Sequence, residues 1–145
     1  NAVITNAKIG NLAVDTINIA NRAVTSQTST VVSSFRNTYV NGVGWVTQTV
    51  ATLTFTGVAG DQVIIGFSVK QLYSGGSDRN AYAYLVLNNS VIGTITARDG
   101  ATVSGSIVRA AGTLTGSNTV KVLAAGANTY ADLTDTTLFV FEAFK

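Results

Sequence analysis

The chain has 145 residues, of which 46% are hydrophobic and 11% charged, and it contains no cysteine, histidine, methionine or proline. This length suits one domain with a short appendage. The missing side chains exclude zinc fingers, disulfide frameworks, Ser-His-Asp triads and Cys-His dyads. Nine Lys and Arg against seven Asp and Glu give a net charge of +2, too balanced for a nucleic-acid-binding surface, so we expect no nucleic-acid partner.

Threonine is in marked excess, with 21 of the 145 residues. The β-branched residues Thr, Val and Ile favour strands, while Gly and Asn supply turns, so the composition predicts an all-β protein. No apolar stretch approaches the roughly 20 residues that span a bilayer, and we expect no membrane insertion by this segment. The first residue is Asn rather than Met, so we expect a fragment of a longer protein.

Residues 1–25 form five successive pentads. The first position is Asn four times and Thr once, and the fourth is always Ile or Val. Neither a helix nor a flat strand keeps apolar residues at this spacing on one side, whereas a chain that turns a corner every five residues does. The expected inward residues are Ile4, Ile9, Leu12, Val14, Ile17, Ile19 and Val24.

One chain supplies too few pentads to bury these residues, because a repeat unit needs stacked neighbours. We therefore predict an intertwined homotrimeric stem over residues 1–25, in which the neighbours are copies of the same chain. Two alternatives stay open: an irregular arm that packs on its own domain, and a truncated β-solenoid.

The segment from Ile4 to Thr25 also resembles part of a known family. The words Asn-Ala-Lys-Ile-Gly at residues 6–10 and Leu-Ala-Val-Asp-Thr at residues 12–16 carry this resemblance, which covers about a sixth of the chain. They resemble the C-terminal region of the tail-tip host-specificity proteins, or central tail fibres, of lambda-like phages. The resemblance implies a homotrimer at the distal end of the virion's tail, outside the cell, whose last module contacts the bacterial surface. It carries no functional residue with it.

The polar stretch 26–30 predicts a linker, and residues 31–145 predict a tip domain. Alternating apolar residues and turn signals every eight to twelve residues indicate about eight strands and an antiparallel β-sandwich. A jelly roll is our choice of topology, by analogy with small trimeric tips. The clearest strands are 47–56, 63–69, 81–87, 91–96, 103–109, 119–124 and 137–144, with hairpin signals at Asn88-Asn89 and Asp99-Gly100.

Two predicted strands are apolar on both faces. Tyr82 and Tyr84 alternate with an Ala/Leu face, and Phe139 and Phe141 alternate with Leu138 and Val140. A sandwich strand needs only one apolar face, so the second could pack against neighbouring subunits or leave the tyrosines at the surface.

No catalytic or cofactor motif is complete. Gly42-Val-Gly44 lacks the context of a nucleotide-binding loop, and Asp132 with Asp135 lacks a calcium-loop pattern. The six acidic residues of the tip domain fall in or beside predicted turns, except Glu142. We expect no enzyme, no cofactor and no metal.

Binding is the better hypothesis, because loops on a rigid β scaffold commonly carry recognition. Three segments combine aromatic, charged and small residues: 73–82, 97–101 and 127–135. The candidate receptor-binding residues are Tyr73, Asp78, Arg79, Arg98, Asp99, Asn128, Tyr130 and Asp132.

We therefore expect a trimeric phage tail-tip module that attaches the virion to a bacterial surface receptor, either an outer-membrane protein or a glycan. The alternatives are a purely structural trimerisation or fibre-capping module and, less favoured, a carboxylate-based glycan depolymerase.

Overall fold

The computed structural model describes residues 25–37, 46–75, 80–126 and 130–143. They form eight β-strands and no helix, so the predicted all-β class is confirmed for this part of the chain. The strands are β1 (Thr25–Arg36), β2 (Val46–Gly57), β3 (Gln62–Ser74), β4 (Asn80–Leu87), β5 (Ser90–Arg98), β6 (Thr102–Gly112), β7 (Gly116–Gly126) and β8 (Ala131–Ala143).

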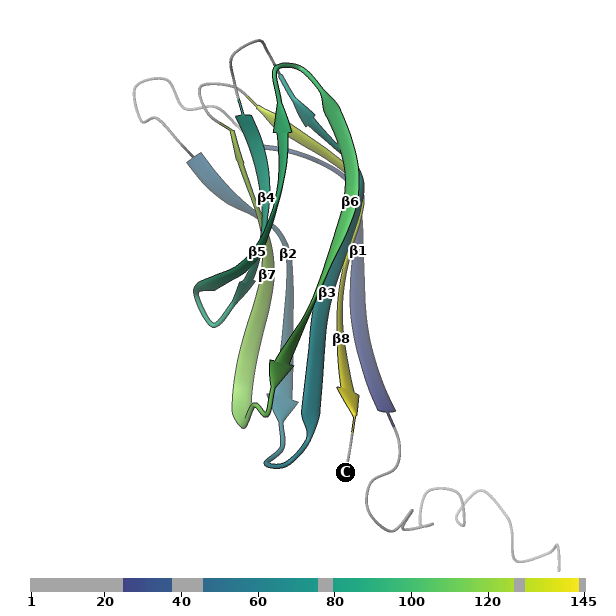
Figure 1. The fold of residues 1–145 in the computed structure, drawn as a ribbon, viewed down its shortest axis with the longest axis vertical. Coiled ribbons are helices and arrows are strands. Elements are labelled where there is room, and N and C mark those ends of the chain that lie inside the picture. Colours follow the sequence, from purple (N-terminus) through teal and green to yellow (C-terminus); the bar gives the residue numbers. More distant parts are fainter. Residues whose placement is uncertain (1–24, 38–45, 76–79, 127–129, 144–145) are drawn as a thin grey trace, which may run out of the picture.

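The strands form two antiparallel four-stranded sheets that face each other (Figure 1). Sheet A has the order β1-β8-β3-β6, and sheet B has the order β2-β7-β4-β5. Consecutive strands alternate between the sheets, except β4 and β5, which pair in sheet B as a hairpin. This is the jelly-roll arrangement, so the predicted sandwich and its topology are confirmed.

The core lies between the sheets and contains the inward residues that alternation predicted. Val63, Ile65 and Phe67 of β3 meet Val120 and Val122 of the opposite sheet, and all five are at most 1% exposed. Side chains along a strand point alternately to its two faces. Once the register between two strands is set, all of their inward-facing residues are therefore set as well. Burial of this set away from water is the main force that holds the two sheets together.

Two turns form where the sequence predicted them. Asn88 and Asn89 both have positive φ, as a two-residue hairpin between antiparallel strands requires. Asp99 and Gly100 also have positive φ, so the predicted turn is confirmed. The strands that it joins lie in different sheets, however, and it is not the hairpin of one sheet that we expected.

The predicted linker is wrong. Residues 26–30 belong to β1, which begins at Thr25 and pairs with β8 along its length. Their Ser and Thr content gave them the polarity of a linker, but Thr is also a good strand former. At the edge of a sheet, pairing with the backbone of a single neighbour holds such a strand without a fully apolar face.

The last strand is longer than expected. β8 begins at Ala131, whereas alternation predicted a start at Thr137. Asp135 has a φ of 47°, which interrupts the regular backbone and hides the continuity of the strand in the sequence pattern. Most of the expected recognition loop 127–135 is therefore strand.

The sandwich has two different ends (Figure 1). At one end, here called the base, β1 begins at Thr25 and β8 finishes at Ala143, and these two residues are register partners. At the other, here called the loop end, β1, β3, β5 and β7 finish and the next strands begin. A strand of about twelve residues separates the ends by about 40 Å. The predicted stem residues 1–24 lie outside the described residues, and the stem stays a prediction.

Both sheets carry aromatic pairs on their outer faces. Tyr82 and Tyr84 of β4 stack with ring centroids 5.7 Å apart, and Phe139 and Phe141 of β8 meet edge to face at 5.5 Å. Phe139 lies across Gly66 of β3, where an added Cβ would come 2.4 Å from the ring. All four rings are half-buried within this chain, and the covering of these rings by another subunit stays a prediction.

Candidate functional site

A row of polar and aromatic residues crosses sheet A at the loop end. Arg36 of β1 is the register partner of Asp132 of β8, which is opposite Tyr73 of β3, and Tyr73 is opposite Thr102 of β6. Register partners in an antiparallel sheet point to the same face. The adjacent row points inward and is apolar; it consists of Phe35, Leu133, Leu72 and Val103. Because neighbouring rows point to opposite faces, the row that contains Arg36 lies on the outer face of sheet A.

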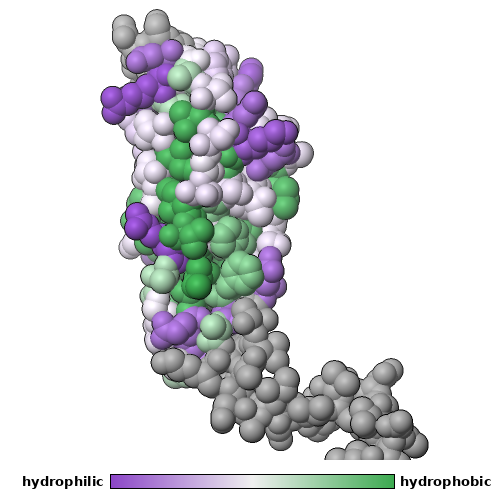
Figure 2. Space-filling view, turned by 45° about the vertical axis from the view of Figure 1, so that its right-hand side comes forward, coloured by the Kyte–Doolittle hydropathy of each residue, from purple (hydrophilic) through white to green (hydrophobic). Residues whose placement is uncertain are grey.

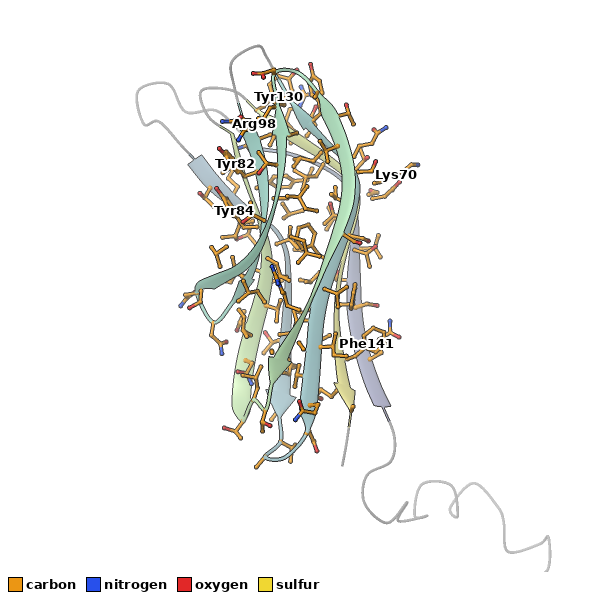
Figure 3. The ribbon with its side chains drawn as sticks, in the orientation of Figure 1. Lys70, Tyr82, Tyr84, Arg98, Tyr130 and Phe141 are labelled. Atoms are coloured by element: carbon orange, nitrogen blue, oxygen red, sulfur yellow. The ribbon has the colours of Figure 1, made fainter. Side chains whose placement is uncertain are left out.

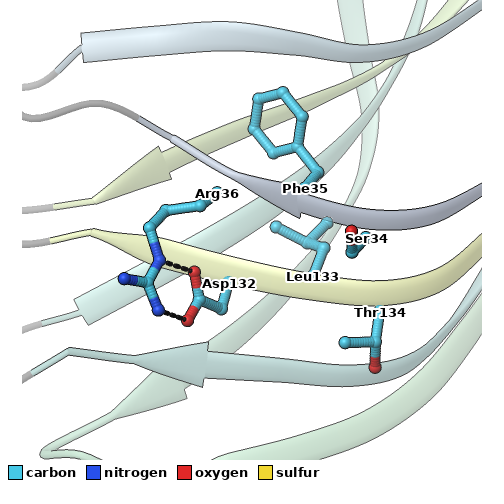
Figure 4. A pocket seen from close by; sticks show the side chains of 6 residues that line it. All are labelled: Ser34, Phe35, Arg36, Asp132, Leu133 and Thr134. Carbon is cyan, nitrogen blue, oxygen red and sulfur yellow. Dashed lines mark hydrogen bonds and ion pairs between the residues drawn. The ribbon is translucent and has the colours of Figure 1, made fainter.

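Arg36 and Asp132 form a bidentate ion pair (Figure 4). The Arg36 Nε donates to one carboxylate oxygen of Asp132, and Nη2 donates to the other. These side-chain hydrogen bonds raise the pKa of Arg36 above its ordinary value. The paired geometry fixes the guanidinium plane while its remaining N–H groups stay available, because the Arg36 side chain is 63% exposed.

Tyr130 and Tyr73 extend this cluster. The Arg36 guanidinium carbon lies 4.2 Å from the centroid of the Tyr130 ring, a cation–π contact. Tyr130 and Tyr73 have centroids 6.2 Å apart and planes tilted by 44°. Figure 3 shows Tyr130 at the loop end of the sandwich. The site thus combines two partly exposed aromatic rings with one fixed cation and one fixed anion.

Buried backbone contacts hold the cluster in place. Asn37 follows Arg36 and is 2% exposed, and its N–H donates to the carbonyl of Ala131 at 3.1 Å. The Ala131 N–H donates in turn to the Asn37 Oδ1 at 2.7 Å. The Gly75 N–H donates to the carbonyl of Tyr130 at 3.1 Å, which ties the end of β3 to the start of β8. The side chains are therefore positioned before any ligand arrives.

A pocket of about 300 Å³ opens beside the ion pair (Figure 4). The Thr134 hydroxyl in its wall is buried and has no hydrogen-bond partner within the described part of the chain. A buried hydroxyl in this position favours a bound water or a ligand oxygen. The pocket is lined by Ser34, Phe35, Arg36, Asp132, Leu133 and Thr134.

The structure brings together three of the eight predicted site residues: Tyr73, Tyr130 and Asp132. Each lies on or next to a strand end rather than within a loop.

Two further predicted residues lie at the same end: Arg98 is the last residue of β5, and Asp99 follows it in the turn to β6. The Ser74 N–H donates to the carbonyl of Ala101 at 3.3 Å, so this turn adjoins the end of β3. The remaining three, Asp78, Arg79 and Asn128, lie outside the described residues.

Sequence reasoning missed Arg36, although it contacts both Tyr130 and Asp132. Its partner Asp132 is 96 residues away in the chain, and no local motif marks the pair. Arg36 and Asp132 are brought together by the pairing of β1 with β8. This pairing could not be used at the sequence level, because β1 was not predicted as a strand.

The described residues give little support to a catalytic carboxylate pair or a metal site. Asp135 pairs with Lys70 at 3.3 Å, so Asp132 and Asp135 each face a different cation. Within the described ranges no group of three or more acidic, His or Cys side chains could hold a metal ion. The same ranges contain no helix suited to crossing a bilayer.

Comparison with known proteins gives likenesses of fold alone. No family model matches the chain, and no curated protein matches it. Among solved structures, the CBM36-1 domain of a multidomain xylanase from the hindgut metagenome of Trinervitermes trinervoides is 11% identical, with a TM-score of 0.39, over 77% of this chain and 96% of that one.

Two other solved structures are similar at the same level. A family 35 carbohydrate binding module from Clostridium thermocellum is 12% identical, with a TM-score of 0.33, over 78% of this chain and 97% of that one. A chain of the infectious bursal disease virus Gx strain structure is 13% identical, with a TM-score of 0.39, over 83% of this chain and 37% of that one.

Proposed function

We propose that this chain is a receptor-binding module of a phage tail tip, which attaches the virion to a receptor on the bacterial surface through the loop end of its sandwich. The observation that carries the proposal is the separation of the two ends. The described chain enters at the base, and the cluster of Arg36, Asp132, Tyr73 and Tyr130 lies about 40 Å away. A fibre joined at the base would point this cluster outward.

The chemistry of the cluster suits a polar surface ligand. Partly exposed tyrosine rings offer flat apolar contact, and the fixed Arg36 and Asp132 offer donors and acceptors at set positions. Saccharide chains and protein loops both present such alternating apolar and hydroxyl or amide groups. Because the cluster is already ordered by its own contacts, little entropy is lost on binding.

The assignment to a virion rests on the resemblance of residues 4–25 to tail-tip host-specificity proteins of lambda-like phages. The proposed homotrimer would carry three copies of the cluster. Simultaneous binding at three weak sites gives one particle a much higher overall affinity than binding at one site. Each site therefore needs only modest affinity. We propose binding without catalysis, since Asp132 and Asp135 are each engaged with a cation.

The proposal is tested by binding of the fluorescently labelled full chain to cells of the host bacterium. The variant Tyr73→Ala with Tyr130→Ala should weaken cell binding at least about tenfold, because aromatic anchors dominate recognition surfaces. Tyr82→Ala with Tyr84→Ala is the matched control, since it removes two tyrosines from the outer face of sheet B. Arg36→Gln should act in the same direction as the first variant.

Equal binding by all three variants, or no binding by the unaltered chain, would contradict the proposal. An assembled chain that binds no cell would favour the alternative of a structural trimerisation or capping module. Release of reducing sugar from host glycan would favour a depolymerase.

A further inference from the structure

The outer face of sheet A divides into two halves of different character. Toward the loop end it carries the Arg36 row described above, followed by the polar row of Ser34, Thr134 and Gln71. Toward the base, three successive outward rows cross the four strands without a single charged residue. These twelve positions, here called the base-side face, are Gln27, Phe141, Ile64 and Ala110; Ser29, Phe139, Gly66 and Val108; and Val31, Thr137, Ser68 and Ser106.

The base-side face is uncharged, seven of its twelve positions are apolar, and it is open in this chain. Val31 is 64% exposed, Val108 56% and Ile64 40%, and they surround the edge-to-face pair of Phe139 and Phe141. Three of the four exposed large hydrophobic side chains of the described residues therefore lie on this one face. Figure 2 shows a band of hydrophobic side chains that widens in the lower half of the molecule, and Figure 3 places Phe141 there.

Such a face is not expected to stay in water. Contiguous apolar patches of several hundred Å² on a soluble domain usually mark an interaction surface. The glycine at its centre adds to its flatness, since Gly66 lets the Phe139 ring lie across the backbone. Charges are present elsewhere on the same sheet, at Arg36, Asp132 and Lys70, so their absence here is a local property.

We propose that the base-side face is the surface on which another copy of this chain packs. This goes beyond receptor binding and does not depend on it. Two features favour a second copy as the occupant. The pentads of residues 1–25 need neighbours to bury their apolar positions, and they join β1 at Thr25, at the base. Copies held together there would bring their base-side faces close together, because the face begins two residues later, at Gln27.

The size of the face fits this shared role. Four strands about 4.8 Å apart and three rows about 6.7 Å apart give about 400 Å². A standard stable interface needs about 800 Å² from each partner, so the face supplies roughly half. The N-terminal pentads of the same copies would supply the remainder.

The absence of cysteine from the sequence allows a sharp test. Val108→Cys and Val91→Cys each create a chain with one thiol, at positions that are 56% and 58% exposed in the isolated chain. Val91 lies on β5 in sheet B, away from the base-side face. In the full chain, we expect the Val108→Cys thiol to react with Ellman's reagent at least about tenfold more slowly than the Val91→Cys thiol. Sedimentation velocity should show that both variants are assembled.

A second pair of variants tests the same face through its energetics. Val108→Glu should raise the dissociation constant of the assembly at least about tenfold, because it places a charge in an apolar contact. Val91→Glu should leave the dissociation constant unchanged. Circular dichroism identifies a variant that fails to fold, and the thiol rates then decide the question.

Three results would overturn the proposal. A wild-type chain that sediments as a monomer at all concentrations has no copy on this face. An assembled chain whose two thiols react equally fast uses another surface. A monomer with a protected Val108→Cys thiol would mean that residues 1–24 fold back onto the face. Each result is obtained without any receptor, so it is separate from the outcome of the cell-binding test.

Discussion

Gly66 illustrates how one residue shapes the outer surface of sheet A. It is a buried strand residue beneath the ring of Phe139, and an added Cβ would lie 2.4 Å from that ring and 2.8 Å from the carbonyl oxygen of Ile107. Contacts this short cannot be met without displacing both the ring and a neighbouring strand. The glycine is therefore required by close packing, not by an unusual backbone angle.

Gly66→Ala should destabilise the fold by about 1–3 kcal/mol, the usual cost of overpacking. The free energy of unfolding in urea measures this. Ser68→Ala, two residues along the same face, is the control and should change stability by less than about 0.5 kcal/mol. An unchanged midpoint for Gly66→Ala would show that the ring moves aside freely.

Ionisation of Tyr84 should lower the stability of the fold at high pH. Burial, and to a smaller extent the neighbouring Tyr82, raises the pKa of Tyr84 above its ordinary value. The folded chain therefore keeps this proton at a pH where the unfolded chain has lost it. The resulting stability is complete below the ordinary tyrosine pKa of about 10 and is lost as pH rises through the higher folded value.

Between about pH 9 and about pH 11, the wild type should lose more unfolding free energy than Tyr84→Phe, which has no phenol to ionise. Urea unfolding of both proteins across this range gives the comparison. Parallel loss in the two proteins would contradict the role of Tyr84.

At the residue scale, sequence reasoning recovered part of the site. Tyr130 and Asp132 were identified because an aromatic residue and a charged residue lie among small residues in this segment. Both residues belong to the cluster. Arg36 did not stand out, because its role comes from a partner 96 residues away. Local composition identifies recognition residues near turns. Residues that are paired across a sheet can be identified only when the register of the two strands is known.

Among the elements, the β4–β5 hairpin is the one most clearly specified by its own sequence. Asn88 and Asn89 adopt φ values of 46° and 69°. The Asn88 amide also fastens the hairpin to β7, donating to Asn118 Oδ1 at 2.8 Å and accepting from the Thr119 N–H at 2.9 Å. The turn residue thus fixes both the hairpin and its position in sheet B.

Asn88→Ala should destabilise the fold by about 2 kcal/mol, because it combines a positive φ with the loss of both side-chain hydrogen bonds. Thermal unfolding followed by circular dichroism is the measurement. Asn89→Gly, at the other positive-φ position, should be tolerated within about 0.5 kcal/mol. Equal effects of the two substitutions would argue against the link to β7.

Most strands were predictable from their alternation, and the first strand was not. Strands β3, β4 and β7 alternate along most of their length, since each has one face in the core. The alternation is broken in β3 at 65–67 and 70–71, and in β4 at 85–86. β1 has a sheet neighbour on one side only, and its first half is Ser, Thr and Gln. Without a strong apolar face its strand character comes from pairing with β8, which composition does not reveal. β8 has neighbours on both sides and a buried face, and it was predicted too short for a different reason: the positive φ of Asp135 interrupts its alternation.

At the scale of the whole molecule, we assign different tasks to the two ends of one rigid sandwich. The base carries the uncharged face proposed for assembly, and the loop end carries the cluster proposed for recognition. Between the two halves of sheet A lies the exposed ion pair of Lys70 with Asp135, which includes no residue of the cluster or of the base-side face. Changes at one end should therefore leave the other end intact.

This separation predicts the behaviour of stem variants. Replacing Ile9 and Ile19 together by Asn in the full chain should abolish assembly, because both are apolar positions of the pentads. The melting temperature of the sandwich should fall by only a few degrees, since the strands of the two sheets build a core of their own within the described residues. Sedimentation velocity and thermal unfolding provide the two readings. Retained assembly would contradict the predicted stem.

Contact between the loop end and the bacterial surface is best tested by hydrogen–deuterium exchange of the full chain on isolated host cell envelope. We predict slowed exchange at residues 36–37, 73–75, 98–101 and 130–132 on binding, with unchanged exchange at the base-side turns 58–61 and 88–89. Protection confined to these base-side turns, or bound chain with no change at the loop end, would contradict the proposed mode of attachment.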